Sequence, residues 1–171
     1  MTIDEEIKRF FLEYHIREKI MPYSSLPEYL QKIQYYIILI HTDLDIDMLV
    51  RILSQIRYEA GDDLNNKVWN KINLLIQTSL EKLSYVAKVS TIEDYGDVSE
   101  VLIKSLMTVN RYRNEFAHPK VDVLLKKYDM KTSQGKIKIR NLVRTLKRAR
   151  NLFLDYTKKS KACKFYIKKT T

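Results

Sequence analysis

The sequence has few residues that break regular structure. Only three glycines and three prolines occur in 171 residues, too few for the turns of a many-stranded sheet. Leu, Ile, Lys, Arg and Glu instead form long runs that favour helix. The hydrophobic content of 45% is enough for one ordinary core. The composition therefore predicts a single all-α domain.

Cysteine and long apolar runs are also scarce. The single cysteine, Cys163, excludes an internal disulfide, and no Cys/His cluster has the spacing of a four-ligand zinc site. The first six residues are acidic rather than basic, the reverse of a secretory signal. The most apolar run, residues 35–40, is far shorter than the roughly 20 residues that span a bilayer. We therefore expect a cytoplasmic protein with no metal or other cofactor and no membrane segment.

Positive charge is abundant but unevenly distributed. The net charge is +10, and residues 136–171 hold 13 Lys and Arg against the single Asp155. Such a basic third favours contact with a polyanion, most commonly nucleic acid and less commonly an anionic membrane surface. A solvated, charge-rich helix and tail is an equally open interpretation.

The apolar residues between the breaks recur at helical spacing. This pattern predicts an antiparallel helical bundle with a four-helix core and additional helices, all within one domain over residues 1–158. A flexible, basic tail is expected over residues 159–171. The predicted helices cover about residues 3–21, 26–41, 44–60, 63–87, 98–117 and 136–156, with a short segment over 122–129.

Polar residues at the predicted helix starts are able to accept hydrogen bonds from the first turn. These predicted caps are Ser25, Asp43 or Asp45, Asp62 or Asp63, and Asp97. Asp43, Asp45 and Asp47 alternate as calcium-loop ligands do, but the glycine and distal glutamate of such a loop are missing. The helix from Trp69 to Ala87 has an apolar stripe of about five turns and is expected at the centre of the bundle.

One segment, residues 113–119, suggests chemistry. Arg113 falls on the apolar stripe of its helix, so it either reaches water or faces a cleft or partner that supplies an anion. Asn114 and His118 lie four residues apart on one helix face, and Pro119 turns His118 away from helical geometry. Asn114 could thus orient one ring nitrogen of His118 and leave the other for proton transfer.

The spacing from arginine to histidine is not selective by itself. Arg9 and His15 match it in the middle of an amphipathic helix, where we expect no site, and we assign no role to His15 or His41. The asparagine directly after Arg113 and the position at a helix end distinguish the second pair.

Arg113-Asn114 followed by His118 resembles the signature of the HEPN superfamily of α-helical domains, in which arginine and histidine are separated by four to six residues. The amino-acid pattern of residues 114–118 is also similar to that of helical regulators of the mannitol-repressor type. The resemblance covers seven residues and the all-α plan. Many toxin members carry tyrosine two residues after the histidine, where this chain has Lys120.

The HEPN resemblance implies a homodimer in which two copies of the motif form a metal-independent ribonuclease site. Arg113 and Asn114 would belong to that site, and His118 would act as general base or acid for attack of the ribose 2′-OH on phosphorus. Such a protein would be a toxin or defence effector with RNA as substrate and a cognate antitoxin as inhibitor.

Two alternatives remain open at the level of sequence. His118 could simply cap carbonyls at its helix end while Arg113 pairs with a carboxylate of a neighbouring helix. The protein would then be a non-catalytic helical module that binds nucleic acid or a partner protein, such as a regulator.

Four basic residues of the last predicted helix are candidates for RNA binding. They recur at helical spacing on the side away from its apolar face and could follow an RNA backbone. A solvated bundle face is the alternative interpretation. The four residues are Arg140, Arg144, Lys147 and Arg148.

Overall fold

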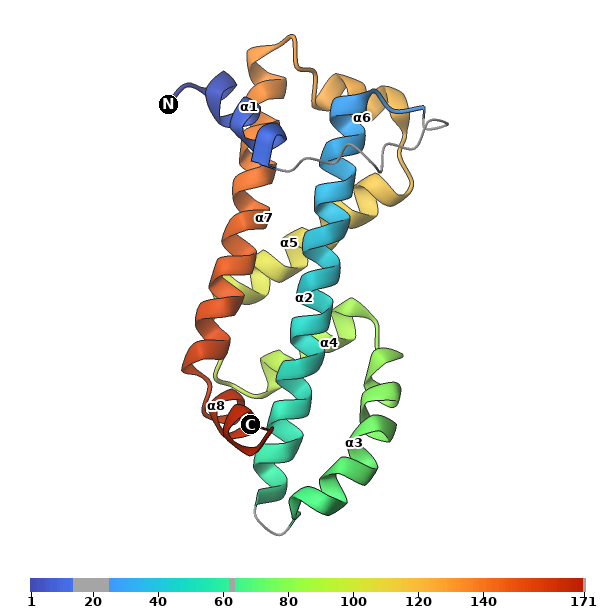
Figure 1. Ribbon diagram of the computed structural model, residues 1–171. Coiled ribbons are helices and arrows are strands. Elements are labelled where there is room, and N and C mark those ends of the chain that lie inside the picture. The colour runs from blue at the N-terminus through green and yellow to red at the C-terminus, as the bar shows by residue number, and fades with distance from the viewer. Residues whose placement is uncertain (14–24, 62–63, 171) are drawn as a thin grey trace.

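The structure is a computed structural model that describes residues 1–13, 25–61 and 64–170 (Figure 1). All regular elements in these ranges are helices, so the predicted all-α bundle is confirmed. In chain order they are α1 (Ile3–Glu13), α2 (Glu28–Ala60), α3 (Asn66–Glu81), α4 (Tyr85–Asp94), α5 (Glu100–Ala117), α6 (Val121–Lys127), α7 (Ser133–Lys159) and α8 (Lys161–Thr170). None of these helices is both long and apolar enough to cross a membrane.

The central helix is α2, which packs against α3, α4, α5, α7 and α8. In Figure 1, α2 and α7 run in the same direction along the length of the molecule. Helix α5 runs obliquely in the opposite direction. The main core includes Ile37, Ile40, Leu106, Leu146 and Phe153, which are completely buried. Each such side chain contributes about 1.5–3 kcal/mol on burial, so this core holds α5 in place.

α2 is one uninterrupted helix of 33 residues, so the predicted break after His41 is wrong. The two candidate caps at that break lie inside the helix and make ion pairs with other helices. Asp43 lies 3.6 Å from Arg150 of α7, and Asp45 lies 2.8 Å from Lys88 of α4. These carboxylates therefore join helices together and do not start a new one.

The ends of the first two helices agree only in part with the prediction. α2 begins after Pro27, which makes no side-chain cap hydrogen bond, so the predicted Ser25 cap is wrong. Gly61 follows the last residue of α2 with a positive φ of 58°, a backbone geometry that favours glycine. The first predicted helix is present over Ile3–Glu13, and its remaining residues lie outside the described ranges.

The helix predicted over residues 63–87 is two shorter helices, α3 and α4. Asn65 caps α3 and Ser84 caps α4, each accepting a backbone hydrogen bond from the first turn. In α3 only Trp69 is buried, while Leu74 and Leu75 are 67% and 71% exposed. The predicted central helix therefore lies at the edge of the molecule, where Figure 1 shows α3 beside the lower half of α2.

The structure also corrects the C-terminal half. Ser99, not Asp97, caps α5 by accepting a hydrogen bond from the backbone of its first turn. α7 begins at Ser133, slightly earlier than predicted. The expected flexible tail contains α8, which packs against α2 and buries Ala162 and Cys163.

Candidate functional site

The candidate site lies at the C-terminal end of α5. Leu102, Leu106, Val109 and Phe116 bury one side of this helix in the main core and so fix its position. The helix ends at Ala117 because Pro119 disfavours helical geometry for the residue before it. His118 accordingly has φ −127° and ψ 68°, outside the α region.

Arg113 is exposed although it continues the buried stripe of α5. One guanidinium nitrogen, Nη1, donates a weak hydrogen bond of 3.3 Å to Oδ1 of the adjacent Asn114. Among the described residues no carboxylate forms an ion pair with Arg113. The guanidinium is thus held at the surface by its neighbour and retains most of its donors for an anion.

His118 is also exposed, at the mouth of a cavity of about 200 Å³ between the end of α5 and α6. Its ring has no hydrogen-bond partner among the described residues, so the expected orientation by Asn114 is absent. The end of α5 is instead capped by Gln34 of α2, whose Nε2 donates to the carbonyl of Phe116 at 2.7 Å. His118 is therefore not needed to cap the helix.

Sequence reasoning missed His41, which the structure places beside the motif. Its Nε2 shares a hydrogen bond of 3.4 Å with Oδ1 of Asn110, and its ring stacks on Tyr85 at 4.2 Å between centroids. Burial lowers the pKa of His41 below 6.5, and the charge of nearby Arg113 lowers it further. Gln34 and His41 lie seven residues apart, and both face α5. The sequence would have shown that His41 lies beside α5 only if α2 had been recognised as one continuous helix.

The four predicted RNA-binding residues do not form a free basic face. Glu6 of α1 accepts two hydrogen bonds from Arg144, at 2.6 and 2.8 Å. These bonds are the main reason that the pKa of Glu6 is lowered, with Arg140 and Lys147 adding to the effect. Arg140 and Lys147 are partly buried, and Arg148 is exposed. Helix α1 thus covers part of the surface expected to bind RNA.

No family model matches this chain, and no significant match is found among curated proteins or solved structures. The assignment of the candidate site therefore rests on the residues of this chain alone. Among the described residues, no group of three or more His, Cys, Asp or Glu side chains is placed to hold a metal ion.

A buried arginine network lies far from the motif and was also missed. Arg51 donates to Tyr156, Gln55 and Asp97 at 2.8, 2.8 and 2.9 Å. Its guanidinium lies 4.8 Å from the ring centre of Tyr95. The network ties α2, α7 and the loop before α5 together, so its role is to hold the bundle.

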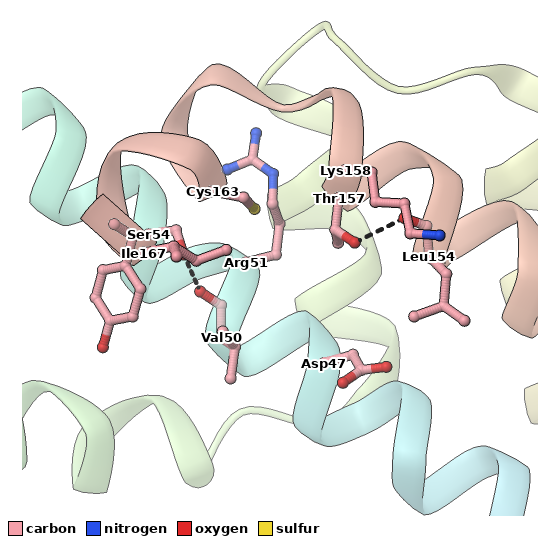
Figure 2. Close-up of a pocket in the computed structure, with 10 residues that line it drawn as sticks. Asp47, Val50, Arg51, Ser54, Leu154, Thr157, Lys158, Cys163 and Ile167 are labelled. Carbon is pink, nitrogen blue, oxygen red and sulfur yellow. Dashed lines mark hydrogen bonds between the residues drawn. The ribbon is translucent and has the colours of Figure 1, made fainter. Parts of the chain in front are cut away.

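A cavity of about 210 Å³ borders this network between α2, α7 and α8 (Figure 2). Its walls are mainly apolar, and Figure 2 shows the Arg51 side chain extending from α2 toward Cys163 of α8. No histidine lines this cavity among the described residues, so it lacks the imidazole that the motif offers for proton transfer. The end of α5 therefore remains the candidate site.

Proposed function

We propose that this protein is a HEPN-like, metal-independent endoribonuclease whose site contains Arg113, Asn114 and His118. The observation that carries the proposal is the joint exposure of Arg113 and His118 at one end of α5, with neither engaged by a carboxylate among the described residues. A guanidinium and an imidazole left accessible at a rigid helix end suit binding of a phosphodiester and transfer of protons.

The chemistry requires no group beyond these side chains. His118 removes the proton from a ribose 2′-OH, and the oxygen attacks the adjacent phosphorus. The bond to the 5′-oxygen breaks, that oxygen takes a proton from a second, protonated imidazole, and the products are a 2′,3′-cyclic phosphate and a 5′-OH end. Arg113 stabilises the charge that develops on the phosphoryl oxygens, and Asn114 restrains its guanidinium through their hydrogen bond.

A homodimer would supply the acid as well as the base, because each copy brings one His118. Within one chain, no hydrogen bond joins Arg113 and His118. Two exposed apolar residues on α2 and α5 offer surface for a second copy: Ile38 of α2 is 49% exposed, and Met107 of α5 is 39% exposed. A two-fold axis near these residues would bring two motifs into one cleft.

In the cell such an activity suits a cytoplasmic toxin or defence effector that is kept inactive by a partner protein. A non-catalytic module that binds nucleic acid or protein is the second candidate. It is favoured by the absence of a hydrogen bond between Arg113 and His118 within one chain. Binding of RNA without cleavage would identify it.

The direct test is incubation of the purified protein with structured and single-stranded RNAs in EDTA. We expect cleavage, with 2′,3′-cyclic phosphate and 5′-OH ends identified by mass spectrometry. Intact RNA across the panel, or cleavage that appears only when Mg²⁺ is added, would refute the proposal.

A further inference from the structure

A second cavity, of about 390 Å³, adjoins the His118 cavity at Glu115. It is formed by α5, α6 and α7, and Glu115 belongs to the walls of both cavities. Three cations line it, one from each helix: Arg111, Lys127 and Lys138. This cavity was not anticipated from the sequence, because its walls come from three separate helices.

The charges in this cavity are not balanced. Glu115 is the single carboxylate in its walls, and it pairs with Lys127 at 2.6 Å. Arg111 and Lys138 are exposed, and neither has a carboxylate partner among the described residues. The cavity therefore presents two uncompensated cations on a concave surface, which attracts an anion.

The other side chains of the cavity suit a ligand that is larger than a simple anion. Tyr112 is half-buried, and the Arg111 guanidinium carbon lies 5.5 Å from its ring centre. Asn141 of α7 is exposed at the rim and offers an amide for hydrogen bonding. Cations combined with an aromatic face are the means by which proteins bind single-stranded nucleic acid, through phosphate contacts and base stacking.

The position of the cavity relative to His118 determines how many nucleotides separate the bound phosphate from the bond that is cut. Arg111 precedes His118 by seven residues, which is about 10 Å along α5. A stacked strand advances about 3.4 Å for each nucleotide, so this distance corresponds to about three nucleotides. The competing basic surface on α7 is less available, because Arg144 is bound to Glu6.

We propose that the cavity between α5, α6 and α7 binds a phosphate and base of a single-stranded RNA about three nucleotides from the bond that is cut. Arg111 and Lys138 bind the phosphate, and Tyr112 contacts the base. The register relative to the cut rests on the proposed ribonuclease function. Binding of RNA by the cavity does not.

The test compares two double variants that lose the same charge. One is Arg111→Ala with Lys138→Ala. Its matched control is Lys71→Ala with Lys126→Ala, two exposed lysines on α3 and α6 that do not line the cavity. Both are made in a His118→Ala background, and their affinity for a labelled 12-nucleotide RNA is measured by fluorescence anisotropy at several salt concentrations.

We expect the cavity variant to weaken binding about tenfold and the control to change it less than twofold. The dependence of log affinity on log salt should fall by about 0.7, because the cavity holds one phosphate and each phosphate contact on a single strand contributes about 0.7. Equal affinities for the cavity variant and its control would overturn the proposal, as would an absence of RNA binding by the parent protein.

Cleavage assays separate this proposal from the ribonuclease proposal. With His118 restored, the cavity variant should cut a 12-nucleotide RNA with a raised KM but should cut a dinucleotide as well as wild type does. Cleavage of both substrates unaffected by the cavity variant would refute the cavity and leave the nuclease standing. RNA that is bound through Arg111 and Lys138 but never cut would support the cavity proposal and refute the ribonuclease proposal.

Discussion

Replacing His118 with alanine is expected to slow RNA cleavage about 10²–10⁴-fold, the usual contribution of a positioned general acid or base. The rate is measured with enzyme in excess over RNA, so that binding does not limit it. His118 is exposed and has no hydrogen-bond partner among the described residues. Its removal should therefore leave the melting temperature and the affinity for RNA close to those of wild type.

The chain contains its own control for this variant. His15 follows Arg9 at a similar spacing, so His15→Ala removes the other histidine of an arginine-to-histidine pattern and should leave the cleavage rate unchanged. Arg113→Lys keeps the charge but loses the planar donor fork of arginine, and it should also slow cleavage. If His118→Ala cleaves as fast as its parent, His118 has no catalytic role.

Replacing Asp97 with alanine is expected to destabilise the fold by about 1.5–3 kcal/mol, the usual value for a hydrogen bond to a charged group. The Arg51 side chain is completely buried, whereas that of Asp97 is 44% exposed. Removing the carboxylate leaves a buried guanidinium without its counter-charge, which is the costly way to break such a pair. Tyr156 also loses the acceptor of its 2.7 Å hydrogen bond. Urea unfolding measures the change in free energy.

Glu100→Ala provides the comparison for Asp97→Ala. Glu100 is an acidic residue only three positions away, and its ion pair with Lys104 is exposed on both sides. Such a pair contributes less than about 1 kcal/mol. Equal losses of stability in the two variants would show that Arg51 does not depend on Asp97. Asp97→Asn, which keeps one hydrogen-bond acceptor, should fall between them.

The end of α5 was predictable because its signals are local. Pro119 acts on the residue before it, and the periodic apolar residues of α5 fix which side enters the core. The partner of Asn114 was not predictable in this way, because its side chain was expected to orient His118 and instead accepts a hydrogen bond from Arg113. The exposure of Arg113 was one of the two outcomes expected for a charge on that stripe.

The course of α2 was not predictable by the same means. Asp43 and Asp45 have the chemistry of helix caps, and only the fold reveals that Arg150 and Lys88 are opposite them. Breaking α2 there concealed that His41 faces α5. Tertiary ion pairs override local capping preferences in this stretch.

The binding surface was hidden for a related reason. Glu6 and Arg144 are 138 residues apart in the chain, and no local pattern indicates that α1 pairs with the basic face of α7. Likewise, Arg111, Lys127 and Lys138 gather only because α5, α6 and α7 pack together. Helical periodicity shows which residues share a face but not which faces meet.

The most direct test of the proposed site is a crystal structure of the protein with a 2′-O-methyl RNA, which cannot be cut by 2′-OH attack. We predict two copies of the chain related by a two-fold axis, with a phosphate of the RNA between Arg113 and His118 in an open cleft. RNA bound elsewhere, with no phosphate near His118 and the two motifs far apart, would contradict it.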